Sequence, residues 1–328
     1  MKKVFFRADA GHGIGYGHFI RTLALADMLK DDFDCTYFTS DPSDYQMAEV
    51  SKVCNYVSLK EESKFDEFLE YITGDEIVVL DNYFFTTEYQ KKLKEKGIKL
   101  VCIDDMHNKH YIADLIINQG ICWSKEDYSC ETYTRFALGF SYSLLRKPFR
   151  EARFTSTHID RRGKLNVIVA FGGSDYLDLT YQIINAIKEL SVVNSITAIV
   201  GDRYSSEKYI RNSKVSYLKN LSASEIVKLF SNNDVSILPA STMMNEALAC
   251  GTNIIGGYYV NNQEYDYYSY LKNKLIFGVD DFTDPLATQR VCNALTKYQD
   301  ESENIQMSSV NAQVLSSQDN LVSLFKIL

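Results

Sequence analysis

The residues best suited to chemistry lie in a glycine-rich segment near the start of the chain, residues 13–21 (GIGYGHFIR). The segment follows a strand expected over Lys2–Arg7 and opens a helix expected over His18–Leu29. Glycine lets such a turn approach a phosphorylated ligand, and a helix N-terminus offers free N–H groups with partial positive charge. The helix dipole disfavours imidazolium at His18, and a neutral imidazole can take a proton from water. The segment therefore predicts a ligand site with His18 as a general base.

Two other interpretations of this segment stay open. Gly-x-Gly-x-Gly after a first strand also opens many dinucleotide-binding domains, although their fingerprint needs Gly-x-Gly-x-x-Gly and an acidic residue after the second strand. Here only Asp41 stands near that position. His18 could equally begin the helix without taking part in any reaction.

The strongest pattern in the second half of the chain is LPASTMMNEA at residues 238–247. Ser241 and Thr242 stand where an expected strand ends and a helix begins, so their hydroxyls and the following N–H groups predict a diphosphate site. Glu246, one turn into that helix, could accept hydrogen bonds from a ribose diol. The competing interpretation is an ordinary Ser/Thr cap followed by a solvated glutamate.

Two further turns and two strand ends carry polar residues. Gly172-Gly173-Ser174 follows the first strand of the second half, and Asn262-Gln263 begins a later helix, where the amides could bind sugar hydroxyls or simply cap the helix. Asp81-x-Tyr83 and Asp104-Asp105 each follow an apolar strand, and a carboxylate there could orient His18. We expect no metal site at Asp104-Asp105, because no His or Glu with ligand spacing accompanies the pair.

Strands and helices alternate in both halves, which indicates parallel sheets. We expect two doubly wound, Rossmann-like α/β domains facing a cleft, a GT-B-like arrangement, with domains 1–150 and 151–328 and a linker over Phe149–Lys164. The expected strands are Lys2–Arg7, Asp34–Thr39, Ile77–Asp81, Leu100–Ile103, Leu115–Asn118, Leu165–Ala170, Ser195–Val200, Val235–Leu238 and Asn253–Ile255.

Composition narrows the class of protein. The chain has 328 residues, a net charge of −8 and 45% hydrophobic residues. The acidic balance argues against nucleic acid or an anionic membrane surface as the main partner. Seven cysteines without a CxxC pair are typical of reduced cytosolic thiols, and no targeting or membrane-spanning segment is evident, so we expect a cytoplasmic protein without stable membrane association.

Taken together and in order, these motifs resemble those of the UDP-sugar hydrolases of pseudaminic acid biosynthesis, which act on UDP-2,4-diacetamido-2,4,6-trideoxy-β-L-altropyranose. The resemblance covers about residues 1–280. The matching motifs are Arg7-Ala8-Asp9, residues 14–21, Leu80–Tyr83, Ile103–Asp105, Ala113–Leu115, Asn118-Gln119, residues 138–150, Phe171–Asp175, Ser241–Ala247 and Asn262-Gln263.

The resemblance implies a GT-B-like fold, a sugar-binding and catalytic first domain, a UDP-binding second domain, and neither cofactor nor metal. It implies that water activated by His18 attacks the anomeric carbon with inversion and expels UDP, with no obligate protein partner. The implied catalytic residues are His18, Asp81 and Tyr83. The implied substrate-binding residues are Gly15, Gly17, Arg21, Asp104, Asn262 and Gln263. The implied UDP-binding residues are Gly172, Gly173, Ser174, Ser241, Thr242, Met243 and Glu246.

Two alternatives fit the same motifs. A metal-independent GT-B glycosyltransferase would use the UDP-sugar as donor and would share every UDP contact. A non-catalytic nucleotide-sugar-binding protein would bind the same ligand without turning it over.

Overall fold

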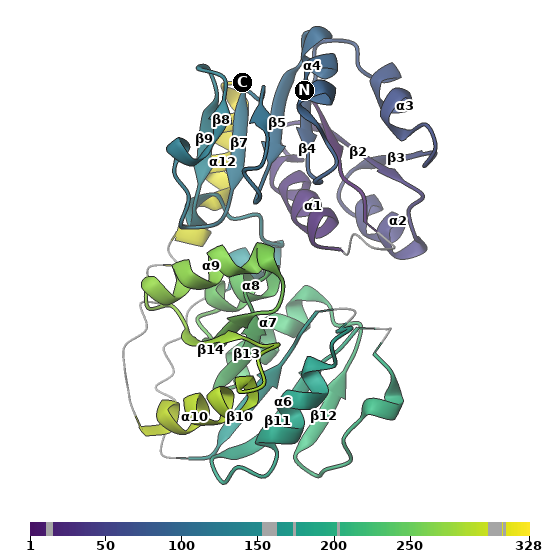
Figure 1. The fold of residues 1–328 in the computed structure, drawn as a ribbon. Coiled ribbons are helices and arrows are strands. Elements are labelled where there is room, and N and C mark those ends of the chain that lie inside the picture. Colours follow the sequence, from purple (N-terminus) through teal and green to yellow (C-terminus); the bar gives the residue numbers. More distant parts are fainter. Residues whose placement is uncertain (11–15, 153–162, 173–174, 202–203, 301–309, 311–312) are drawn as a thin grey trace. The chain divides into compact units, whose positions relative to one another are not determined.

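The computed structural model describes residues 1–10, 16–152, 163–172, 175–201, 204–300, 310 and 313–328. The chain forms two units: the first comprises Met1–Lys147 and Gln313–Leu328, and the second comprises Pro148–Ala312. Each unit is built on one parallel sheet (Figure 1), as the alternation of strands and helices predicts.

The first unit contains a seven-stranded sheet with the strand order β3-β2-β1-β4-β5-β7-β9. Its strands are β3 (Asn55–Leu59), β2 (Asp34–Ser40), β1 (Lys3–Arg7), β4 (Ile77–Leu80), β5 (Lys99–Ile103), β7 (Leu115–Asn118) and β9 (Arg135–Leu138). Its longer helices are α1 (Gly17–Leu29), α2 (Asp44–Ser51), α3 (Lys64–Glu70), α4 (Thr87–Glu95) and α12 (Ser317–Lys326). Two short strands, β6 (His110–Tyr111) and β8 (Ser129–Cys130), pair beside it.

Alternating side chains of the central strand β1 serve both faces of this sheet. Val4 and Phe6 join a core with α1 and α12, whereas Phe5 joins a second core with Phe68 of α3 and Leu93 of α4. This alternation follows from the two-residue period of a strand, and it leaves β1 and β4 buried in the middle of the sheet.

The second unit has a six-stranded parallel sheet with the order β12-β11-β10-β13-β14-β15. Its strands are β12 (Val215–Leu218), β11 (Val193–Ile199), β10 (Leu165–Val169), β13 (Val235–Pro239), β14 (Asn253–Tyr258) and β15 (Phe277–Asp281). Its helices are α6 (Leu179–Ile187), α7 (Ala223–Asn232), α8 (Thr242–Ala249), α9 (Asn261–Lys272) and α10 (Ala287–Asp300).

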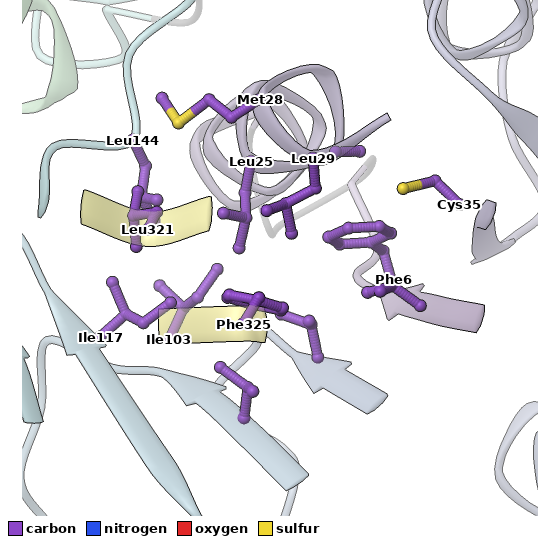
Figure 2. Packing of buried hydrophobic residues seen from close by; sticks show 14 of the residues in the cluster. Phe6, Leu25, Met28, Leu29, Cys35, Ile103, Ile117, Leu144, Leu321 and Phe325 are labelled. Atoms are coloured by element: carbon purple, nitrogen blue, oxygen red, sulfur yellow. The ribbon is translucent and has the colours of Figure 1, made fainter. Parts of the chain in front are cut away.

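The end of the chain differs from the expected domain boundary. We expected residues 151–328 in the second domain, but α12 packs in the first unit, where Leu321 and Phe325 are fully buried. Figure 2 shows these two side chains among the apolar residues of α1 and the sheet. Burial of these two apolar side chains explains why α12 packs in the first unit, because each contributes roughly 1.5–3 kcal/mol to the free energy of folding.

The expected linker also begins inside packed structure. Phe149 lies in the short helix α5 (Lys147–Arg150) and is fully buried. Most of the remaining linker, residues 153–162, lies outside the described residues.

Candidate active site

His18 and Asp81 meet at the carboxyl edge of the first sheet. His18 is the second residue of α1, which follows β1, and Asp81 directly follows β4, which pairs with β1. The Nδ1 atom of His18 lies 2.7 Å from Oδ1 of Asp81, and the two residues are 6% and 1% exposed. An ionised carboxylate can only accept a hydrogen bond, so Nδ1 carries the ring proton and the lone pair resides on Nε2.

Three residues of one helical turn converge on Asp81. Arg21 donates from Nε to Oδ2 at 2.7 Å and from Nη2 to Oδ1 at 2.6 Å, and Thr22 donates from Oγ1 to Oδ2 at 2.8 Å. They reach the carboxylate together with His18 because positions three and four apart share a helix face. Burial by itself would raise the pKa of Asp81, but Arg21 and then His18 lower it well below its usual range. Asp81 is therefore an anion at neutral pH, hydrogen-bonded to His18.

Tyr83 and Asp105 extend this cluster. The Tyr83 ring stands edge-on to the His18 ring with centroids 4.6 Å apart, and its hydroxyl donates to Oδ2 of Asp105 at 3.3 Å. Arg21 donates from Nη1 to the same oxygen at 2.8 Å. We expected Arg21 to bind substrate. In the structure its guanidinium bridges Asp81 and Asp105, and it thereby links the segments that follow β4 and β5.

Asp104, which we expected to bind substrate, has another role. Its carboxylate accepts hydrogen bonds from the backbone N–H groups of Met106 and His107 and from the Tyr111 hydroxyl. These bonds hold the loop after β5. The bend that follows β5 turns the Asp104 carboxylate back to its own loop, and Asp105 reaches Arg21.

Gly17, expected beside the substrate, stands at the first position of α1. A methyl group added there would meet no atom within 4 Å, so nothing among the described residues requires glycine at this position. The other expected glycine of this turn, Gly15, lies outside the described residues.

The start of α8 in the second unit differs from an ordinary capped helix start. Ser241 occupies the N-cap position without a side-chain capping bond, and Thr242 and Met243 form the first turn. Glu246 is 3% exposed. Of the competing interpretation, the solvated glutamate is wrong, because Glu246 is buried, and Ser241 stands at the N-cap position without making the capping bond.

The start of α6 is different, because a side chain of the protein, Asp175, bonds to its backbone N–H groups. Gly172 has a φ of +81°, which suits a tight turn, while Gly173 and Ser174 lie outside the described residues. The two carboxylate oxygens of Asp175 accept hydrogen bonds from the N–H groups of Leu179 and Thr180, each at 2.9 Å. These bonds occupy the donors that an anion would need.

The two amides at the start of α9 divide their roles. Gln263 accepts from the backbone N–H of Tyr259 at 3.1 Å, so it ties the helix start to the loop after β14. Asn262 is exposed at the helix start. This bond does not cap the helix, because the N-cap residue of α9 is Val260 and no side chain bonds to it there.

Sequence reasoning missed one member of the cluster, Thr22, and of the pair Asp104-Asp105 it chose Asp104 as the site residue, whereas Asp105 bonds to Arg21. Thr22 stands four residues after His18, and that spacing was the available signal. Among the residues that the structure describes, no group of three or more His, Cys, Asp or Glu side chains is arranged to hold a metal ion. Within the same residues, every helix is too short or too polar to cross a bilayer.

Comparison with solved structures identifies the fold class of the chain. The chain superposes on MurG from Acinetobacter baumannii with a TM-score of 0.66 and 12% identity, covering 100% of both chains. It superposes on UGT89C1 from Arabidopsis thaliana, solved with UDP, with a TM-score of 0.69 and 11% identity, covering 99% of each. Such identities show the fold alone, which is the GT-B fold of two Rossmann-like domains.

The sequence comparison is more specific. The chain is 28% identical over 280 residues to the UDP-2,4-diacetamido-2,4,6-trideoxy-β-L-altropyranose hydrolase of Campylobacter jejuni, covering 80% of this chain and 93% of that protein. This similarity confirms the resemblance that the ordered motifs indicate. A scan against protein-family models found no match.

Proposed function

We propose that this protein hydrolyses a UDP-linked diacetamido-trideoxyhexose, releasing UDP and the free sugar. The similarity to the Campylobacter jejuni hydrolase supports the substrate class. The hydrogen bond of 2.7 Å between His18 Nδ1 and Asp81 is the observation that carries the reaction, because it leaves the basic lone pair on Nε2.

In the proposed reaction, Nε2 of His18 takes a proton from a water molecule. The water oxygen forms a bond to the anomeric carbon while the bond from that carbon to the β-phosphate oxygen breaks. The bonding electrons leave with UDP, which is a good leaving group. Asp81 stabilises the imidazolium that forms, as a buried carboxylate does for a histidine base.

The second unit would hold UDP at the start of α8. A helix N-terminus favours a diphosphate through its free N–H groups and its dipole. The start of α8 has no side-chain cap, whereas Asp175 fills the start of α6. In this assignment Ser241, Thr242 and Met243 bind the diphosphate, and the buried Glu246 accepts hydrogen bonds from the ribose hydroxyls.

Three further residues that the sequence predicts as catalytic or substrate-binding would lie near the sugar. Tyr83 is 44% exposed while its ring touches His18, which suits a residue that contacts both base and substrate. Gly17 would leave room for the sugar beside His18, and Asn262 would offer its amide to a hydroxyl or acetamido group. One base and a good leaving group require no cofactor.

The experiment is to incubate the purified protein with the UDP-linked sugar in water and follow UDP release. Release without any added acceptor, at a rate proportional to enzyme, is the expected result. Tight binding of the UDP-sugar without turnover would instead identify a binding protein and refute the proposal.

A transferase is the second candidate, because the structural neighbours include glycosyltransferases. It would use the same UDP site and the same base to activate an acceptor hydroxyl. UDP release that stays negligible in water and rises only with an added acceptor would favour it.

A further inference from the structure

Asp105 lies in the cluster around His18 without touching the imidazole nitrogens. Its Oδ2 accepts hydrogen bonds from Arg21 at 2.8 Å and from Tyr83 at 3.3 Å. Its other oxygen, Oδ1, is buried and has no hydrogen-bond partner among the described residues. A carboxylate held through one oxygen, with the other unpaired, retains more uncompensated negative charge than one with both oxygens bonded.

The charges around Nδ1 of His18 nearly cancel without Asp105. The Asp81 oxygen lies 2.7 Å from Nδ1 and favours a positive ring, but Nη2 of Arg21 lies 3.1 Å from the same atom and opposes it. One anion and one cation at similar distances leave little net stabilisation for an imidazolium.

Asp105 changes this balance because it pairs with the opposite end of the guanidinium. With His18 neutral, Asp81, Asp105 and Arg21 carry a net charge of one negative unit. When His18 takes a proton, the four groups become neutral together. The four groups therefore reach zero net charge when His18 carries one additional proton. The negative charge of Asp105 is what makes this balance possible.

We propose that Asp105 is a positioning residue that offsets the charge of Arg21, so that Asp81 can stabilise the imidazolium formed on His18. The inference rests on the proposed function of His18 as the base. It assigns to Asp105 a role that its neighbour Asp104, occupied by the loop after β5, does not have.

Other charged and titratable groups face the cluster. Lys109 donates from Nζ to the backbone carbonyls of Tyr83 and Phe85, each at 3.0 Å, and His107 lies close enough to interact electrostatically with Asp105. Among the described residues, Asp81, Arg21 and Tyr83 contact His18 or Asp105, His107 interacts electrostatically with Asp105, and Asp104 and Lys109 bond within the adjoining loops.

The test measures the protonation of His18 directly. The chain has five histidines, so NMR of histidine-labelled protein can follow each ring, and His18→Asn identifies the His18 signal by its loss. We expect Asp105→Asn to move the midpoint of the His18 titration down by about one pH unit. Asp105→Glu, which keeps the charge, should restore it. Asp27→Asn, which removes a carboxylate paired with Lys30 on the same helix, should leave it unchanged.

Kinetics supply a second readout. With the UDP-sugar, Asp105→Asn should lower kcat by up to about tenfold, since the rate follows the strength of the base, and should shift the acid limb of the pH profile to lower pH. KM should stay near the wild-type value. Asp105→Ser removes the same charge and replaces Asp105→Asn if that variant does not fold.

An unchanged His18 midpoint in Asp105→Asn would overturn the inference. A raised KM with an unchanged midpoint would also overturn it, because Asp105 would then bind substrate directly. If the wild-type protein released no UDP, the proposed hydrolysis would fail, yet the NMR midpoint would still decide whether Asp105 controls the charge on His18.

Discussion

Asp81→Asn is the substitution that most directly examines the cluster. It preserves the size of the side chain and removes one negative charge from a position that is 1% exposed. Asp81 accepts hydrogen bonds from His18, from Thr22 and twice from Arg21, so all of these donors lose a charged acceptor.

The cost in stability follows from the buried ion pair with Arg21. Removing one partner of such a pair costs about 3–5 kcal/mol, because the other charge is left poorly compensated. Asp105 still bonds to Arg21 and moderates this loss, so we expect a decrease in the free energy of unfolding near the lower figure, about 3 kcal/mol.

The loss of activity should be larger than the loss of stability explains. An asparagine can donate as well as accept, so it no longer fixes the proton on Nδ1 of His18, and it does not stabilise an imidazolium. Loss of effective base catalysis should lower kcat by about two to four orders of magnitude. UDP affinity should stay unchanged, because the proposed UDP site lies in the other unit.

The stability effect has a definite pH dependence. The folded protein lowers the pKa of Asp81 below its unfolded value, so the carboxylate contributes fully above about pH 4, and its contribution is lost as the pH falls towards the folded pKa. The difference in unfolding free energy between wild type and Asp81→Asn should therefore be constant near neutral pH and should shrink below about pH 4.

Asp114→Asn is the matched control. Asp114 is also a largely buried carboxylate of the first unit, and it pairs with Lys94 at 2.6 Å. However, it precedes β7 and so lies at the amino edge of the sheet, away from His18. Denaturant unfolding should show comparable losses in the two variants, and UDP-release assays well below both melting temperatures should show a large loss only in Asp81→Asn. A kcat within about threefold of wild type in Asp81→Asn would refute the reasoning.

The remaining predictions separate chemistry from binding. His18→Asn should slow UDP release by about two to four orders of magnitude at unchanged UDP affinity, and wild-type turnover would exclude His18 as the base. Glu246→Ala should weaken UDP binding by about 1.5–3 kcal/mol in calorimetry, through loss of charge-assisted hydrogen bonds, and an unchanged affinity would place the ribose elsewhere. Hydrolysis should survive EDTA and give a product of inverted anomeric configuration when sampled early by NMR; retention would show that a carboxylate acts as nucleophile and would contradict direct attack by water.

The central strands could be recognised from the sequence, but the edge strands could not. All nine strands that we expected are present. The four longer strands that were missed, β3, β9, β12 and β15, are the outer strands of the two sheets. An outer strand is covered on fewer sides, and the mixed burial of β3 and β12 shows why neither has the apolar run that marks β1 or β4.

The sequence alone also determined where reactive side chains must gather. Residues that follow parallel strands lie at one edge of a sheet, so the positions of His18 and Asp81 after β1 and β4 already placed both at the same edge, and the pairing of β1 with β4 makes them neighbours. Ser241 at the junction of β13 and α8 could be predicted in the same way, because a strand-to-helix turn is readable from local pattern.

Only the tertiary structure decided which neighbouring side chain takes part. Asp104 and Asp105 are chemically identical and adjacent, and the direction of each side chain depends on how the chain leaves β5. The return of α12 was equally invisible, because Gln318 bonds to the Met28 carbonyl 290 residues earlier in the chain. Local pattern reports the period of an element and the residues at its ends, whereas the side-chain direction and long-range packing are set by contacts that form only when the whole chain folds.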